Sequence, residues 1–197
     1  MQFSIFTAAA ALVSSVHAAN HMVVAGKDGL TFEPNNVKAA VGDTVTFKFW
    51  PKNHSVAQAA FAKPCEPLAN GFWSGFIPST DKAAATTFTY EVKNASAPVW
   101  FYCTQGMHCQ GGMVGAINAP ASGNTVEKFV ENSKNATRNV SPVSTAGTGG
   151  SLASNGSAST GSGSNSTGPA QNTNGAATVQ YSTFLAGAVG MVAYLMI

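Results

Sequence analysis

The sequence predicts a small all-β domain placed between processing signals and a structureless stalk. Residues 20–120 contain short runs of alternating apolar and polar side chains, separated by Gly, Pro and Asn. Residues 139–174 are almost entirely Ser, Gly, Thr, Asn and Ala, and both ends of the chain are apolar. Because only about 100 residues remain for a core, we expect one domain.

The strands are predicted from side chains that alternate between two faces. After a Gly-Asp turn, the sequence places Val45, Phe47 and Phe49 on one face and polar residues on the other. An aromatic run that ends at Cys103 is suited to a central strand. Short strands between Gly, Pro and Asn indicate a sandwich or a barrel. The clearest strands are expected at residues 44–49, 86–92, 99–103 and 114–118.

Electrostatics points to no particular class of macromolecular partner. Charged residues make up 9% of the chain, and the formal net charge is +2. The sequence has neither the basic stripe that would indicate nucleic acid nor an acidic tail. We expect a monomer that binds no nucleic acid.

Residues 1–18 are predicted to form a signal peptide. Their apolar stretch is too short to span a bilayer, and Val16-His17-Ala18 offers small or apolar residues at the positions that cleavage requires. We therefore expect the cut after Ala18. The alternative is a buried amino-terminal helix.

The carboxyl-terminal end has the order of a GPI-anchor signal. The small residues Asn174-Gly175-Ala176 precede a polar spacer and an apolar tail at 184–197, which is short for a spanning helix. We predict attachment at Asn174, with Gly175 as second choice, and loss of 175–197 as a propeptide. The protein would then be secreted and held at the outer face of the plasma membrane or in the wall, touching the membrane only through the anchor. The alternative is a tail-anchored or merely hydrophobic end.

Between the domain and the anchor, residues 139–174 are predicted to be a disordered, glycosylated linker, because they have too little apolar surface to offset the entropy of ordering. Residues 121–138 are predicted to be a short helical or irregular extension, with Asn124 as a possible helix cap. Asn-x-Ser/Thr acceptor sites begin at Asn94, Asn135, Asn155 and Asn165.

The residues that carry chemistry gather in a glycine-rich stretch, residues 103–113. It contains Cys103, His108 and Met113, and a tight loop of this size can bring three side chains to one point. His54 lies far upstream, just after another predicted strand. One thiolate with two imidazoles suits copper in both oxidation states, and a thioether on the axis tunes the redox potential. We therefore predict one copper ion bound by these four residues.

The cysteine count agrees with this prediction without proving it. A secreted chain tends to oxidise cysteines in pairs, and this chain has 3. The unpaired one forms an intermolecular bridge, stays an idle thiol, or binds a metal. If Cys103 binds copper, Cys65 and Cys109 remain and can pair.

With these residues in view, the sequence resembles the phytocyanin branch of the cupredoxins over about half of its length, and its layout is similar to fungal extracellular serine-rich, GPI-anchored cupredoxins. The resemblance implies a Greek-key cupredoxin sandwich over residues 19–120 and a bridge between Cys65 and Cys109. It also implies that Asn53 steadies the loop carrying Cys103. The motif consists of Asn53-His54, Cys65, and Cys103-x4-His108-Cys109-x3-Met113.

Two functions are compatible with these residues. The first is a blue-copper (type 1) carrier of one electron at the cell surface, with an unknown redox partner. The second is a structural or adhesive wall glycoprotein whose domain binds or stores copper. We do not expect an enzyme, because a multicopper oxidase needs many more histidines than the three that remain of the 4 once His17 leaves with the signal peptide.

Overall fold

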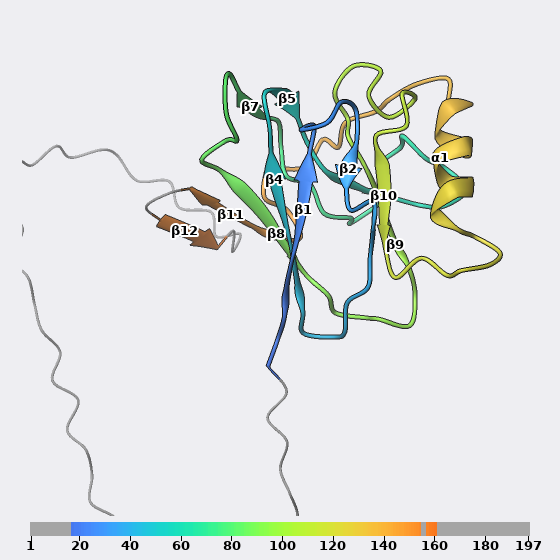
Figure 1. Cartoon of the computed structure of the whole chain (residues 1–197), viewed down its shortest axis with the longest axis horizontal. Helices are drawn as coiled ribbons and strands as arrows, with labels where there is room; N and C mark the ends of the chain where they lie inside the picture. Colours follow the sequence, from blue (N-terminus) through green and yellow to red (C-terminus); the bar gives the residue numbers. More distant parts are fainter. Residues whose placement is uncertain (1–16, 155–156, 161–197) are drawn as a thin grey trace, which may run out of the picture. The chain divides into compact units, whose positions relative to one another are not determined.

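Two β-sheets pack face to face in the computed structural model, which describes residues 17–154 and 157–160 (Figure 1). A helix lies beside the smaller sheet. The strands are β1 (Asn20–Ala25), β2 (Phe32–Glu33), β3 (Asn36–Val37), β4 (Thr44–Phe49), β5 (Lys52–His54), β6 (Ala57–Ala59), β7 (Ile77–Ser79), β8 (Thr87–Glu91), β9 (Val99–Tyr102), β10 (Val114–Ile117), β11 (Ser151–Ser154) and β12 (Ser157–Thr160), and the helix is α1 (Val126–Lys134).

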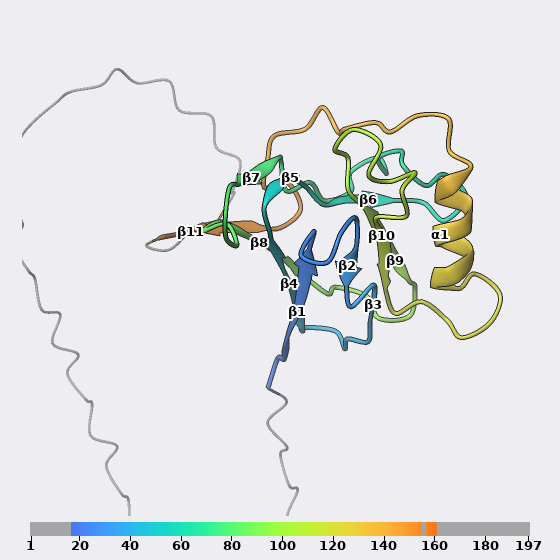
Figure 2. The ribbon, with the colours of Figure 1, turned by 45° about the horizontal axis from the view of Figure 1, so that its top comes forward.

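The strand order brings distant parts of the sequence together. The larger sheet runs β12-β11-β8-β4-β1-β2, and the smaller runs β3-β10-β9-β6. β1 pairs with β4 in parallel, and β3 pairs with β10 in parallel, whereas the other pairs are antiparallel. A separate pair, β5 and β7, lies beyond the end of the larger sheet (Figures 1 and 2).

Alternating residues of β4 fill the space between the sheets. Val45, Phe47 and Phe49 have no exposed surface, as the alternation predicts, while Lys48 faces solvent. Phe47 makes edge-to-face contacts with Phe32 and, across the sandwich, with Phe101 of β9 at 5.2 Å between ring centroids. Such aromatic contacts add to the burial energy of the core.

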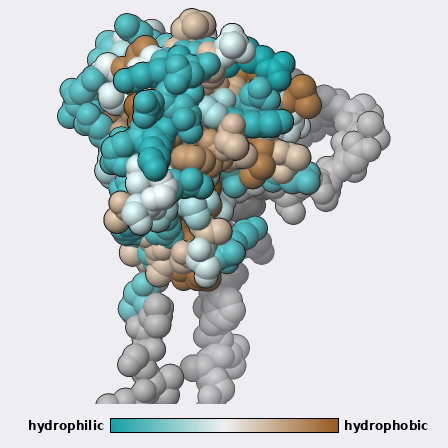
Figure 3. Space-filling model, turned by 90° about the vertical axis from the view of Figure 1, so that its right-hand side faces the viewer, coloured by the Kyte–Doolittle hydropathy of each residue, from teal (hydrophilic) through white to brown (hydrophobic). Residues whose placement is uncertain are grey.

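β9 is buried on both of its faces, which explains its continuous aromatic run. Val99 and Phe101 belong to the core between the sheets. Trp100 and Tyr102 point to the opposite face of the sheet, and the ring centroids of Trp100 and Phe129 of α1 are 4.8 Å apart. α1 therefore covers the outer face of the smaller sheet, and its exposed side carries charged residues on a mainly hydrophilic surface (Figure 3).

The helix in the predicted 121–138 extension begins one residue later than the suggested cap. Thr125, not Asn124, is the N-cap, because its side chain accepts a hydrogen bond from the backbone nitrogen of Lys128. The acidic Glu127 lies in the first turn and the basic Lys134 in the last, as the helix dipole favours.

The prediction of a structureless linker is wrong for residues 139–154, which we call the C-terminal strap. β11 within the strap pairs with β8 and extends the larger sheet. Upstream of β11, the backbone nitrogen of Val140 donates to the carbonyl of Cys65 over 2.9 Å, and that of Gly147 donates to the carbonyl of Trp73. The strap is ordered because its backbone hydrogen bonds are made to the domain, which supplies the apolar surface that the strap itself lacks.

Several predicted features lie outside the described residues. These are residues 1–16 of the signal peptide, the acceptor sites at Asn155 and Asn165, and the anchor signal with Asn174. Within the described part of the chain, no helix has the length and apolar character needed to cross a membrane.

Candidate metal centre

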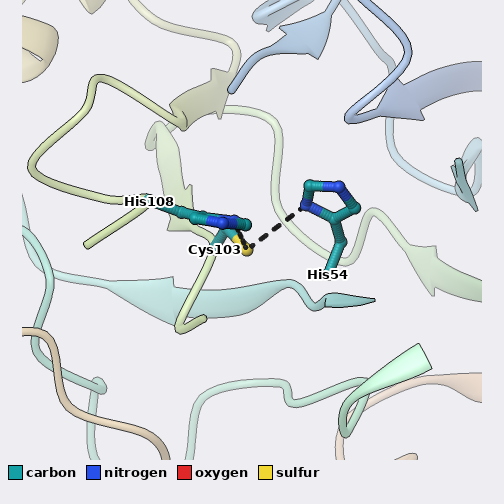
Figure 4. Close-up of side chains that lie close together, drawn as sticks. All are labelled: His54, Cys103 and His108. Carbon is teal, nitrogen blue, oxygen red and sulfur yellow. Dashed lines mark hydrogen bonds between the residues drawn. The ribbon is translucent and has the colours of Figure 1, made fainter. Parts of the chain in front are cut away.

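The structure brings three of the four predicted ligands to one point (Figure 4). His54 ends β5, Cys103 directly follows β9, and His108 lies in the turn after Cys103. The side-chain donor atoms of these three residues all lie within 4.8 Å of one another. Met113, immediately before β10, is completely buried in the core.

The sulfur of Cys103 lies between the two imidazoles. Its Sγ is 3.9 Å from Nδ1 of His54 and 3.5 Å from Nδ1 of His108. The two rings are 5.0 Å apart at their centroids and tilted by 44°. Each imidazole therefore presents the nitrogen nearer its backbone to the thiol.

Backbone hydrogen bonds close the loop from Cys103 to Met113. The nitrogen of Cys103 donates to the carbonyl of Met113 over 3.0 Å, and the nitrogen of Met113 donates to the carbonyl of His108 over 3.0 Å. A further bond joins the nitrogen of His108 to the carbonyl of Gln105. This network holds the backbones of all three predicted loop ligands together.

Burial determines the protonation states of His54, Cys103 and His108. Burial is the main cause that lowers the pKa of His54 to about 4, and the positive charge that His108 would carry lowers it further. Burial also lowers the pKa of His108 and raises that of the Cys103 thiol. The imidazoles are thus neutral and free to bind a cation, whereas a Cys103 thiolate needs a cation nearby to be stable.

Ser55 connects the two segments that form the site. Its backbone follows His54, and its hydroxyl accepts a hydrogen bond from the backbone nitrogen of Thr104 over 2.9 Å. The same hydroxyl lies 2.9 Å from the Thr104 hydroxyl and 3.8 Å from the Cys103 sulfur. Ser55 is completely buried, so this connection is shielded from water.

Two asparagines form hydrogen bonds with the ligand loop. Asn53 donates from Nδ2 to the side-chain oxygen of Gln105 over 2.9 Å. Asn139, in the C-terminal strap, donates from Nδ2 to the carbonyls of Cys103 and Gly106, over 3.1 and 3.0 Å. Nothing in the sequence pattern singled out Ser55 or Asn139 as part of the site.

Cys65 and Cys109 form a disulfide, which leaves Cys103 as the free cysteine of the described residues. The bridge spans a sequence separation of 44 residues. A loop of that length gains about 4 kcal/mol in the chain-entropy account of disulfide stability. Because Cys109 follows His108, the bridge also fastens the ligand loop to the segment after β6.

Other singled-out side chains lie around the site or away from it. Met107, next to His108, is 67% exposed. Phe72 and Trp73 are buried, whereas Phe76 is 45% exposed. The acceptor residues Asn94 and Asn135 are both exposed.

Two curated proteins are similar to the chain in sequence. No family model matches the chain. The chain is 41% identical over 108 residues to a probable GPI-anchored cupredoxin of Arthroderma benhamiae, covering 55% of each protein. It is 34% identical over 140 residues to an extracellular serine-rich protein of the same fungus, covering 71% of this chain and 54% of the relative. The chain thus spans about half the length of the curated relatives it matches.

Solved structures that resemble the chain are much less similar to it in sequence. A purple cupredoxin from Nitrosopumilus maritimus covers 49% of this chain and 96% of its own, with a TM-score of 0.39 and 16% identity. An auracyanin from Roseiflexus castenholzii covers 53% of this chain and 100% of its own, with a TM-score of 0.37 and 16% identity. The folded domain is a β-sandwich, and the chain resembles a probable GPI-anchored cupredoxin and an extracellular serine-rich protein of a fungus.

Proposed function

We propose that this domain binds one copper ion through His54, Cys103, His108 and Met113 and carries one electron at the cell surface. The observation that carries the proposal is the buried thiol of Cys103, which has an imidazole nitrogen within 4 Å on each side. One sulfur and two imidazole nitrogens are the donor set that copper favours in electron-transfer sites.

The surroundings of the thiol favour a bound cation. Burial opposes ionisation of Cys103, so a buried thiolate needs a positive partner. Within the described residues, the ionisable side chains grouped with it are two imidazoles whose neutral forms burial favours. The backbone of Met113 is hydrogen-bonded to that of Cys103, and its completely buried side chain brings no charge.

Copper held there supplies a one-electron couple between its two common oxidation states. The chain's own part is to keep the ligands in one arrangement and to exclude water. The loop hydrogen bonds, the Ser55 hydroxyl and the disulfide restrict movement of the ligand residues. A fixed ligand set lowers the reorganisation that accompanies electron transfer. His108 is only partly buried, so its ring edge is the route by which an electron enters or leaves.

The proposed location is the outer face of the plasma membrane or the wall. The predicted signal peptide and anchor signal support it, as does similarity to a probable GPI-anchored cupredoxin and an extracellular serine-rich protein. The redox partner is a further protein or small molecule of the cell surface. No substrate pocket is needed for this function.

The test is copper titration of the secreted protein, followed by visible spectroscopy and voltammetry. We expect one copper ion per chain, an intense visible thiolate-to-copper band and a reversible one-electron wave. Cys103→Ser should abolish the band. If the wild-type protein binds copper and shows the band but gives no reversible wave, electron transfer is excluded and the structural or copper-storage role remains. A wild-type protein that is colourless with copper would refute the site.

A further inference from the structure

The amino-terminal end of β1 converges on one carboxylate. The backbone nitrogen of Ala19 donates to Oδ1 of Asp43 over 2.8 Å, and Nε2 of His21 lies 2.9 Å from Oδ2 of the same residue. Asp43 is only 8% exposed, and the backbone nitrogen of Ala40 also donates to it. This carboxylate is therefore fixed in place. It lies at the end of β1 opposite to the β5–β7 pair (Figure 1).

Processing would change the chemistry of this end. The predicted cut after Ala18 turns the Ala19 nitrogen into a free amine and makes His21 the third residue of the mature chain. Ala19 and Asn20 are exposed, and the His21 side chain is 30% exposed. A metal ion can therefore reach these residues from solvent.

A chain with a free amine and histidine in third position can surround a metal with nitrogen alone. The donors are the amine, the two intervening amide nitrogens and Nδ1 of the imidazole. Fused chelate rings place them in one plane, and a tetragonal nitrogen set is the one that Cu(II) and Ni(II) prefer.

We propose that the processed chain binds a second metal ion, Cu(II), through the Ala19 amine, the amides of Asn20 and His21, and Nδ1 of His21. The site contains no thiolate. It is separate from the cupredoxin site and does not depend on it, but it does rest on cleavage after Ala18.

Asp43 supports both ends of this chelate. His21 directs Nε2 to the carboxylate, and within the described residues its Nδ1 makes no hydrogen bond. Metal-bound imidazoles commonly donate their other N–H to a carboxylate, which fixes the tautomer and the ring. The amine keeps hydrogens after it binds metal, so it can still donate to the other oxygen of Asp43.

Binding of Cu(II) releases protons and transfers no electron. The ammonium of Ala19 loses one proton, and the amides of Asn20 and His21 lose one each, while the metal stays Cu(II). Successive backbone nitrogens of a strand point to opposite sides, whereas the chelate directs those of Asn20 and His21 to one ion. Residues 19–21 must therefore leave the extended conformation, and the pair Asn20↔Thr44, the first of the β1–β4 ladder, is lost. The pairs from Met22↔Thr46 onward can remain.

The test uses the secreted Cys103→Ser protein, in which the thiolate is absent. Mass spectrometry establishes the first residue, and titration with Cu(II) or Ni(II) establishes binding. We expect a chain that begins at Ala19, one bound equivalent, and a Cu(II) paramagnetic resonance spectrum of nitrogen ligands only.

Two variants separate the chelate from ordinary surface binding. His21→Ala should lose the bound equivalent. One alanine inserted before Ala19 keeps His21 and Asp43 but moves the amine by one residue, and it should also abolish the all-nitrogen spectrum. The proposal would be overturned if the mature chain begins at another residue or if the Cys103→Ser protein binds no Cu(II) or Ni(II). It would also be overturned if the protein with the inserted alanine binds the metal undiminished.

Discussion

At the scale of single residues, the predicted ligands differ from the residues that support them. His54, Cys103 and His108 are marked in the sequence by residue type and spacing, because metal chemistry restricts which side chains can serve. Gly26 and Ser55 carry no such mark. Their roles depend on contacts between segments that are distant in sequence, and these contacts exist only in the folded chain.

Gly26 provides the space that the His54 ring occupies. A Cβ placed on Gly26 would lie 2.1 Å from Nε2 of His54, and the backbone of Gly26 has φ +79°. Gly26→Ala should therefore displace the imidazole and weaken copper binding, as measured by titration and by the visible band.

Gly29→Ala is the matched control for that substitution. Gly29 has φ +96° but no atom within 4 Å of its added Cβ. It should show the backbone penalty of about 1 kcal/mol that alanine incurs at positive φ, with an unchanged copper spectrum. Equal copper affinity in the Gly26→Ala and Gly29→Ala proteins would contradict the role given to Gly26.

Met113 is predicted to set the reduction potential. A neutral thioether favours the lower-charged copper state more than an oxygen ligand does, and the axial ligand tunes the potential. Met113→Gln should keep a visible band and lower the potential measured by voltammetry. Met107→Gln is the control, because Met107 is 67% exposed and should leave the potential unchanged. Equal shifts in the two proteins would exclude Met113 as an axial ligand.

At the scale of elements, the regular strands were predictable and the C-terminal strap was not. Alternation places β4, β8, β9 and β10 within a residue or two of their observed bounds, because burial of one or both faces leaves a periodic pattern. The strap is rich in small residues, which a sequence argument treats as disorder.

The same small residues allow the strap to lie against aromatic rings. A Cβ on Gly150 would lie 2.5 Å from Cζ of Phe88, and one on Gly149 would lie 2.9 Å from Cβ of Phe72. Glycine here reflects close approach to the core. Composition alone cannot distinguish that cause from chain flexibility.

Asn139 is expected to position the ligand loop. Asn139→Ala removes two hydrogen bonds to loop carbonyls and should cost about 1–2 kcal/mol of folding free energy. The substitution should also alter the electron paramagnetic resonance spectrum of bound copper or its reduction potential. Asn135→Ala is the control, since Asn135 bonds a carbonyl of its own helix and should affect stability alone. If the copper spectrum and the reduction potential are unchanged in the Asn139→Ala protein, Asn139 contributes to stability alone.

The same contact predicts that Asn139 carries no glycan. It begins an Asn-x-Ser acceptor triplet, but Nδ2 uses both of its hydrogens on the carbonyls of Cys103 and Gly106. A sugar on Nδ2 would remove one of them. Mass spectrometry of the secreted protein should find Asn139 unmodified, and a fully occupied site with a normal copper spectrum would contradict the contact.

At the scale of the whole molecule, the folded unit extends past the boundary expected at residue 120. α1 and the strap complete it on two sides, and the strap joins the larger sheet to the ligand loop. The stability of the copper site and of the sandwich should therefore change together.

Truncation tests this boundary. A secreted chain that ends at Arg138 loses β11 and several hydrogen bonds worth about 1 kcal/mol each, and it uncovers part of Phe88. It should unfold at a lower temperature than a chain that ends at Thr160, in both metal-free and copper-loaded forms. Equal melting temperatures would mean that the strap is not part of the folded unit.

The most direct test is a crystal structure of the copper-loaded domain, with anomalous scattering recorded at the copper edge. Our account predicts one copper peak between β5 and the loop after β9, bonded to Nδ1 of His54, Nδ1 of His108 and Sγ of Cys103, with the Met113 sulfur on the axis. A map without a peak there, or a Cys103 sulfur bonded to another cysteine, would contradict it.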